Sequence, residues 1–515
     1  MKKKLIRFLI ILGSAILIAG IIAEIKIHNK NKILCKNCNI LLISLDTLSA
    51  NHLPCYGYDK NTAPSLCQFA KDNIFFPNSY SQSHWTRPSQ TSVFTGLHLT
   101  THGVEVPYVS KLDKKYKTIA ETLKGYNYAT YYFGPPIDNS SWDESVVKGF
   151  DYDKQGIYKI NSLKNWQMAL DILEQNQRDK KPTFMFLHTY YVHSPYIVGN
   201  EKLKFINDED KRKDIPLDYD SYYAFTLEME QLVLTSLETR AKRDNSADSA
   251  KVVNEMLSNF KKAKTHDDKR LVFQSFSPNE IESFARVLYF KKFKEGKLSE
   301  YAKSLYDERI YQLDTEIKDF LTRVKDKFDK DTIVIIYADH GETLGERGRY
   351  GHCESYPDCL YMETIRVPLI IKVPGIKNKK INKLAQGIDI YPTIMKLIGK
   401  DGPQNLEGED LFNIKKDYVI AESQDDKTVI IDKKWSLLVK SSMIDDPDQI
   451  ELYDLMNDKN QLVNVAQKYP KVTAIRINIL KKYIMDQGKK PKNEYVFPDW
   501  VDEVKKEKII KEGYF

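Results

Sequence analysis

The chain has 515 residues, of which 42% are hydrophobic and 29% charged, values that exclude a fibrous or wholly disordered protein. Its length suits one large α/β domain with appended segments. Residues 1–32 hold seven Lys/Arg and one Glu, whereas the other 483 residues carry 71 basic and 70 acidic side chains, so the net charge of +7 lies mostly at the N-terminus. A near-neutral body argues against a nucleic-acid partner, which requires a basic face.

Residues 1–32 are predicted to form a short cytoplasmic tip and a membrane anchor. An uncharged run from Phe8 to Ala23 follows three lysines, and with Leu5 and Ile6 it covers nineteen positions, close to the roughly 20 that span a hydrocarbon core. A cleaved signal peptide is the alternative, although signal h-regions are shorter, about 7–15 residues. In either case we expect the remaining chain to be exported. The positive N-terminus favours a single-pass protein of the cell (inner) membrane with an extracytoplasmic, periplasmic body.

Six cysteines fall into three local pairs: Cys35/Cys38, Cys55/Cys67 and Cys353/Cys359. The first pair alone has the spacing of a redox or zinc motif, but no second CxxC is present to complete a zinc site. Structural disulfides in an oxidising compartment are the better interpretation, although six cysteines allow fifteen connectivities.

Four apolar runs that end in polar residues are predicted to be buried parallel strands, at 39–45, 128–134, 183–190 and 332–340. Helical patterns at 118–126, 163–176 and 305–328 lie between or before them. This alternation predicts a doubly wound, mostly parallel α/β sheet within residues 33–414, with ligands bound at the carboxyl ends of the strands.

Two further parts follow from changes in pattern. Between about 200 and 300 strand-like runs vanish and amphipathic helical stretches appear, which predicts a helical insertion, either a solvated decoration or a cap over the site. Residues 415–515 are predicted to form a small α+β subdomain, with antiparallel strands near 418–423, 428–440 and 451–455 and a terminal helix.

Polar residues at the predicted strand ends suggest a metal site. Asp46 and the pair Asp339-His340 supply two carboxylates and an imidazole at one sheet edge. Such ligands suit a divalent cation, Ca, Mg, Mn or Zn, whereas a single strand-end Asp more often only caps a loop or helix.

Thr86 is the candidate nucleophile. Pro88 can open a helix, which would place the Thr86 hydroxyl at a helix N-terminus, where backbone N–H groups favour an anion. A hydroxyl beside a metal and an anion site is what phosphoryl or sulfuryl transfer requires. A plain helix N-cap is the alternative role for this threonine.

Seven segments, in order and in spacing, resemble the sulfatase family of the alkaline phosphatase superfamily. They are residues 39–58, 85–96 with 101–103, 187–196, 338–353, 366–375, 389–399 and 451–458. The resemblance implies that residues 33–414 are a sulfatase-like catalytic domain that acts on an anionic ester of a glycan, a lipid head group or a small molecule.

The resemblance also assigns roles to particular residues. It implies that Asp46, Asp339 and His340 are metal ligands and that Thr86 is both ligand and nucleophile. His193 and His352 would be general acids or would bind the transferring group; His102 and His188 lie at looser motif positions.

The sequence departs from the family at three positions. Sulfatases carry a Cys or Ser that is oxidised to formylglycine and an Arg four residues later, where this chain has Thr86 and Gln90. Thr47 replaces a second aspartate. Threonine cannot give the aldehyde, so the site looks more like the metal-bound threonine site of phosphodiesterases and of phosphoethanolamine or phosphoglycerol transferases.

The sequence therefore predicts a metal-dependent hydrolase of phosphate- or sulfate-type esters. A phosphoethanolamine- or phosphoglycerol-type transferase is one alternative, although such transferases usually have several membrane spans. A formylglycine-independent sulfatase and a non-catalytic anion- or glycan-binding pseudoenzyme are the others. The oligomeric state is left open.

Overall fold

A computed structural model of the chain describes residues 35–105, 110–134, 143–151, 162–199, 203–207, 215–217, 258, 262, 289–352, 359–423 and 426–487. The predicted membrane anchor and most of the predicted insertion at about 200–300 lie outside these residues. Within the described ranges, no helix combines the length and apolar character needed to cross a membrane.

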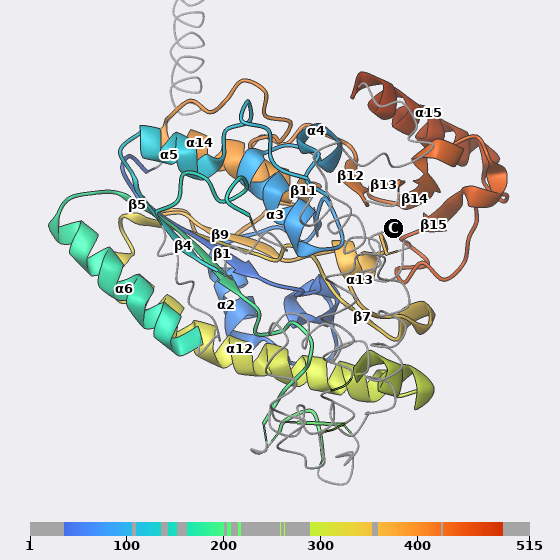
Figure 1. Cartoon of the computed structure of the whole chain (residues 1–515), viewed down its shortest axis with the longest axis horizontal. Coiled ribbons are helices and arrows are strands. Elements are labelled where there is room, and N and C mark those ends of the chain that lie inside the picture. The colour runs from blue at the N-terminus through green and yellow to red at the C-terminus, as the bar shows by residue number, and fades with distance from the viewer. Residues whose placement is uncertain are drawn as a thin grey trace, which may run out of the picture.

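The main domain is built on a seven-stranded sheet with the order β10-β2-β9-β6-β1-β5-β4 (Figure 1). Strands β6, β1, β5 and β4 are mutually parallel, whereas β9 runs antiparallel to β6 and to β2. The bounds are β1 Asn39–Leu45, β2 Ile74–Phe75, β4 Ala129–Phe133, β5 Thr183–Thr189, β6 Thr332–Tyr337, β9 Leu369–Lys372 and β10 Lys379–Lys380. The four predicted strands and the mostly parallel sheet are confirmed.

The central strands are continuous apolar runs because both faces of the sheet are covered. Every residue of β1 is buried, with Leu41, Ile43 and Leu45 in one hydrophobic cluster and Ile40 and Leu42 in the other. Side chains of a strand alternate between its two faces, so a strand buried on both shows no polar alternation.

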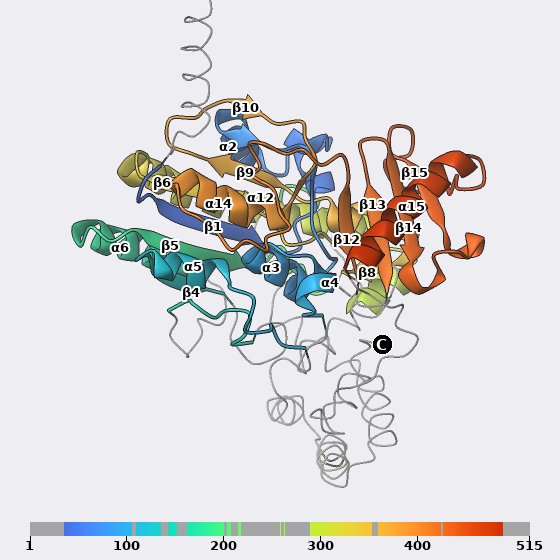
Figure 2. The same ribbon diagram turned by 90° about the horizontal axis from the view of Figure 1, so that it is seen from above.

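Helices cover the two faces in separate layers (Figures 1 and 2). One layer holds α2, α6 and α12, and the other holds α3, α5 and α14. The bounds are α2 Pro64–Asp72, α3 Thr86–Thr95, α5 Ile119–Gly125, α6 Ser162–Arg178, α12 Ser299–Phe328 and α14 Ile390–Ile398. All three predicted helices are present, and α12 begins six residues before its predicted start at Leu305.

A second, antiparallel sheet forms the predicted C-terminal subdomain, but it has four strands, because the predicted segment 428–440 folds into the paired strands β13 and β14. It has the order β12-β13-β14-β15 and packs one face on α15 through Ile477 and Leu480. Its other face packs on the main domain through Tyr80 and Leu360. The bounds are β12 Val419–Glu422, β13 Lys427–Ile431, β14 Trp435–Lys440, β15 Glu451–Asp454 and α15 Pro470–Asp486.

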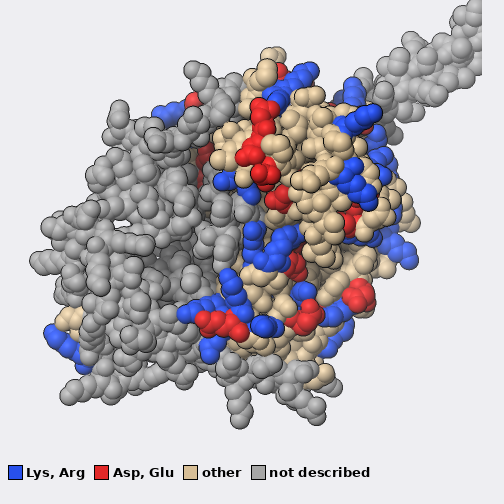
Figure 3. Space-filling model, turned by 90° about the vertical axis from the view of Figure 1, so that its right-hand side faces the viewer, with Lys and Arg blue, Asp and Glu red and all other residues tan. Residues whose placement is uncertain are grey.

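On the face seen in Figure 3, basic and acidic side chains of the described residues are interspersed, consistent with the near-neutral body.

Short elements complete the main domain. Strand β3 pairs with β11 in parallel, and β7 pairs with β8 in an antiparallel hairpin. The bounds are β3 Ser79–Tyr80, α4 Leu99–His102, β7 Thr343–Leu344, β8 Tyr350–Gly351, α13 Met362–Ile365 and β11 Ala385–Gln386.

Disulfides join Cys35 to Cys38 and Cys55 to Cys67, and Cys359 is also disulfide-bonded. The predicted structural disulfides are therefore present in the described part of the chain.

Candidate active site

The predicted site residues converge at the carboxyl edge of the three central strands. In the sheet register, Ser44 of β1 lies beside His188 of β5 on one side and Tyr337 of β6 on the other. Asp46 and Asp339 each follow two residues later, so both carboxylates leave the sheet at the same level. Asp46 and Asp339 are 0% and 1% exposed.

The distances between these side chains define a compact cluster. The Nε2 of His340 lies 3.4 Å from the Oδ1 of Asp46, 3.8 Å from the Oδ2 of Asp339 and 3.3 Å from the Oγ1 of Thr86. One ligand atom each from Asp46, His188 and Asp339 lie within 4.8 Å of one another. The structure thus brings together all four predicted metal-site residues and adds His188.

The tautomer of His340 shows that the cluster fits a cation. Its Nδ1 lies 2.8 Å from the backbone oxygen of Gly341, which can only accept, so Nδ1 carries the proton. The Nε2 lone pair therefore faces the hydroxyl of Thr86 and, slightly farther away, carboxylate oxygens of Asp46 and Asp339. The Oδ2 of Asp339 is buried and has no hydrogen-bond partner. Such facing lone pairs repel each other, and a bound divalent cation would remove this repulsion.

The pKa shifts within the cluster also favour binding of a cation. Burial, followed by the charge of Asp46, raises the pKa of Asp339 to about 7. Burial, followed by His352, lowers the pKa of His340 well below its usual value. Two buried acids beside a neutral imidazole leave negative charge uncompensated, which is the electrostatic condition for cation binding.

Glycine is required directly after His340. A Cβ atom at Gly341 would lie 2.1 Å from the backbone oxygen of Glu363, closer than any real contact. The backbone N–H of Gly341 donates to the backbone oxygen of Thr364. This close approach fixes the turn that aims His340 at the cluster.

Thr86 is the first residue of α3, after Trp85 in extended conformation, as the sequence predicts. Its side chain is buried at the N-terminus of α3, where the positive end of the helix dipole favours an anionic group. Its neighbour Arg87 is engaged elsewhere, in a buried ion pair with Asp143. The hydroxyl of Thr86 therefore lies between an anion-binding helix terminus and the cluster.

Gln90, four residues after Thr86, connects the three central strands beneath the cluster. Its Nε2 donates to the Oγ of Ser44 at 2.6 Å and faces the Nδ1 of His188 at 3.3 Å, and its Oε1 accepts from the hydroxyl of Tyr337. With Nδ1 accepting, the Nε2–H of His188 donates to the Oδ2 of Asp46 at 3.1 Å. In this arrangement His188 orients Asp46 and is not itself a ligand. For its Nε2 to bind a cation, the proton would have to lie on Nδ1, and the Gln90 side-chain amide would have to rotate so that its oxygen accepts from Nδ1–H.

The ring of His352 packs against both His340 and His193. The ring centroid of His352 lies 4.8 Å from that of His340 and 5.0 Å from that of His193. The Nδ1 of His352 lies 3.2 Å from the Oε1 of Glu342, so Nδ1–H donates to a buried carboxylate. Glu342 was not predicted, although it lies three residues after Asp339 within the recognised segment.

Two further histidines differ in role. His84 is 1% exposed, its Nδ1 has no hydrogen-bond partner, and burial followed by His352 lowers its pKa to about 3. It contributes to the histidine-rich wall of the site, a role that was not predicted. His102 accepts from the N–H of Val104 and bonds the Oγ of Ser92, so both its ring nitrogens have structural partners.

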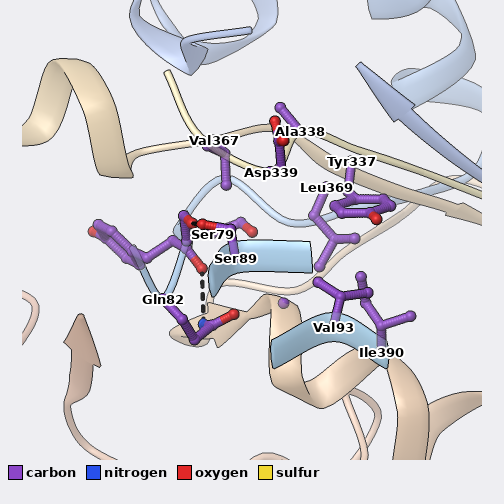
Figure 4. Close-up of a pocket in the computed structure, with 13 residues that line it drawn as sticks. Ser79, Gln82, Ser89, Val93, Tyr337, Ala338, Asp339, Val367, Leu369 and Ile390 are labelled. Atoms are coloured by element: carbon purple, nitrogen blue, oxygen red, sulfur yellow. Dashed lines mark hydrogen bonds between the residues drawn. The ribbon is translucent and has the colours of Figure 1, made fainter. Parts of the chain in front are cut away.

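A small pocket lies behind the cluster, between β3, β6, β9 and α3 (Figure 4). Ser79, Gln82 and Ser89 line one side, Val93 lines the bottom, and Asp339 lies at the top. Its polar groups bond one another: the Oγ of Ser89 lies 2.9 Å from that of Ser81, and Gln82 donates to the backbone oxygen of Tyr80. We therefore regard this pocket as packing that supports Asp339.

Comparisons with known proteins agree with this geometry. Residues 38–400 match the family model described as Sulfatase, and residues 351–490 match the model for N-sulphoglucosamine sulphohydrolase, C-terminal. The chain is 22% identical over 462 residues to the uncharacterized sulfatase YidJ of Escherichia coli (strain K12), covering 84% of this chain and 83% of YidJ. It is 29% identical over 164 residues to arylsulfatase K of Canis lupus familiaris; this match covers 28% of this chain and only 29% of arylsulfatase K.

Solved structures share the fold at low identity. A protein solved in complex with its substrate D-glucosamine-2-N,6-O-disulfate has a TM-score of 0.61 and 17% identity, covering 89% of this chain and 100% of that chain. A phosphonate monoester hydrolase from Silicibacter pomeroyi has a TM-score of 0.54 and 16% identity, covering 87% of this chain and 96% of that chain. These relatives support a sulfatase-like ester hydrolase. Because the Sulfatase model matches well over half of the chain, the chain belongs to the sulfatase family.

Proposed function

We propose that this chain is a metal-dependent hydrolase of phosphate- or sulfate-type esters that uses Thr86 as its nucleophile. The observation that carries the proposal is the position of the Thr86 hydroxyl, 3.3 Å from the Nε2 of His340 and at the N-terminus of α3. Asp46, Thr86, Asp339 and His340 would hold the cation. A bound divalent cation would lower the pKa of the hydroxyl and neutralise charge on the ester.

The protein's own groups would divide the reaction into two steps. Thr86 Oγ1 loses its proton to solvent and attacks the phosphorus or sulfur atom, so a new ester bond to threonine forms while the bond to the substrate alcohol breaks. Water then attacks the same atom and releases the inorganic anion, which restores the threonine hydroxyl. The positive N-terminal end of α3 would bind the oxygens of the transferring group.

His352 and His193 would protonate the leaving-group oxygen of the substrate. The Nδ1–H of His352 donates to Glu342, so a proton taken up by Nε2 gives an imidazolium paired with a carboxylate. The Nδ1 of His193 faces the backbone oxygen of Ser194 at 2.6 Å, so its Nε2 is likewise the reactive nitrogen. The two rings are adjacent, and either one could serve a given substrate.

The proposal is tested by comparing Thr86→Ala with Thr86→Ser. Both variants and the parent are assayed with an aryl phosphodiester, an aryl phosphomonoester, an aryl sulfate and a sulfated amino sugar. Serine keeps the hydroxyl, so Thr86→Ser should retain turnover, whereas Thr86→Ala should lose at least about 10³-fold, the scale of losing a catalytic nucleophile. Full activity of Thr86→Ala would remove this residue from the mechanism. Mass spectrometry of the Thr86 peptide during turnover would identify the bound group.

Export of the body to an extracytoplasmic compartment, with residues 1–32 as a membrane anchor, is part of the same proposal. The disulfides Cys35–Cys38 and Cys55–Cys67 support export, because structural disulfides persist in oxidising compartments. Fractionation of the producing cells, with alkylation of free thiols, tests it. Recovery of a soluble, fully thiol-reactive protein from the cytoplasm would contradict it.

A further inference from the structure

Helix α12 holds the loop that follows β1, and this loop carries Asp46. Asp307 accepts from the Nδ1–H of His52 at 2.7 Å and from Lys60 at 2.9 Å. Two helical turns later, Asp314 accepts from the backbone N–H groups of Ser65 and Leu66 in the first turn of α2. The helix therefore fixes the loop at several points away from the cluster.

The residue after Asp46 has an unusual backbone conformation. Thr47 has φ = 58°, in the left-handed region, which disfavours a β-branched residue by about five- to thirty-fold. Thr47 is fully buried, and its own hydroxyl has no hydrogen-bond partner that would compensate. Its backbone N–H lies 3.4 Å from the Oδ1 of Asp339. The conformation of Thr47 therefore sets the relative positions of the two carboxylates, Asp46 and Asp339.

Tyr306 of α12 bridges this turn from both sides. Its hydroxyl donates to the backbone oxygen of Thr47 at 2.5 Å and accepts from the backbone N–H of Ser49 at 2.9 Å. The ring is 0% exposed and packs edge-on against His52 and Tyr196, with centroids 4.9 and 5.6 Å away. The phenol is thus rigidly placed, and both of its hydrogen bonds go to the strained turn.

We infer that Tyr306 is a positioning residue: its hydroxyl holds Thr47 in the left-handed conformation and thereby aims Asp46 at the cation. The inference rests on the proposed metal site and goes beyond it, because it assigns a role to a helix that contributes no ligand. Burial raises the pKa of Tyr306 well above its usual value, so the hydroxyl stays protonated and able to donate.

The test removes only the hydroxyl. Tyr306→Phe keeps the ring and its packing, and Mn²⁺ is titrated into the purified, chelator-treated full chain. Loss of a group that orients a metal ligand typically weakens metal binding by about 10- to 100-fold, which is the expected result. Tyr391→Phe is the matched control, because this buried phenol also bonds two groups, Thr118 and Thr122, but lies on α14. It should leave Mn²⁺ affinity within about threefold of the parent value, smaller than any change expected from an orienting group.

Two further measurements distinguish a positioning role of the Tyr306 hydroxyl from a general loss of folded structure. Glycine adopts φ = 58° without strain, so Tyr306→Phe combined with Thr47→Gly should regain about tenfold in Mn²⁺ affinity. In the metal-free protein, Tyr306→Phe should speed amide exchange in the peptide containing Ser49 by about tenfold or more, since its acceptor is lost.

Each contrary outcome is specific. Unchanged Mn²⁺ affinity in Tyr306→Phe, an equal loss in Tyr391→Phe, or no regain with Thr47→Gly would each overturn the inference. If the parent itself bound no Mn²⁺, the proposed metal function would fail. The exchange of Ser49 would still decide the role of Tyr306, and unchanged exchange would overturn it.

Discussion

Replacing Asp339 with Asn should change how the stability of the metal-free protein depends on pH. Asp339 is 1% exposed and lies beside Asp46, and burial followed by that charge raises its pKa from 3.8 to about 7. The folded protein therefore keeps a proton on Asp339 at pH values where the unfolded chain has lost it. The contribution of Asp339 to stability should be largest below about pH 4 and should be lost as the pH rises through about 7.

The size of the effect follows from the two pKa values. At 1.36 kcal/mol per pKa unit, a rise from 3.8 to about 7 corresponds to a loss on the order of 4 kcal/mol above pH 7. Between pH 5 and pH 8 the loss should be about 2–3 kcal/mol. Asparagine has no proton to lose at this position, so Asp339→Asn should remove this part of the pH dependence.

The assay is urea unfolding of the chelator-treated protein at pH 5 and pH 8. The parent is compared with Asp339→Asn and with Asp319→Asn, an exposed position on α12 that makes the same change in net charge. From pH 5 to pH 8, the unfolding free energy of Asp339→Asn should fall less than that of the parent, and that of Asp319→Asn should fall by the same amount as the parent's. Equal falls in all three proteins would refute the description of two facing buried carboxylates.

Three further predictions concern neighbouring features. Glu342→Gln should lower kcat by about tenfold with little change in KM, because His352 loses its paired carboxylate; steady-state kinetics with an unchanged kcat would contradict this. Replacing Cys55 and Cys67 with Ser should lower the unfolding free energy by about 3 kcal/mol, as for a closed loop of about 15 residues; urea unfolding without a measurable loss would argue against the disulfide. Removing metal with a chelator should abolish ester hydrolysis, and adding a divalent cation should restore it; activity that survives complete removal would exclude the metal-dependent reaction.

The fold was predictable because its main signals are local in the sequence. The buried strands are short apolar runs, and the polar residue after each run marks the carboxyl edge of the sheet. Asp46 and Asp339 could therefore be placed together before their contact was known. Pro88 likewise marked the start of α3 and the place of Thr86 within it. The start of α12 was displaced, because the turn before Leu305 carries mostly polar residues.

The contacts that orient the site could not be predicted, because they join elements far apart in the chain. Gln90 was noticed only as a departure from the family pattern, yet it contacts the strand ends at Ser44, His188 and Tyr337. Nothing in the local sequence around Tyr306 indicates that its hydroxyl bonds a turn 259 residues away. Such pairings depend on how helices pack on the sheet, which amphipathic patterns constrain only loosely.

The central claim is that Asp46, Thr86, Asp339 and His340 surround a single cation. Anomalous diffraction from crystals of the chain grown with Mn²⁺ tests it most directly. We expect one strong peak in this cluster, about 2.0–2.6 Å from a carboxylate oxygen of Asp46 and of Asp339 and next to Thr86 Oγ1. A cluster without a peak, or a peak bound only by residues elsewhere in the protein, would contradict it.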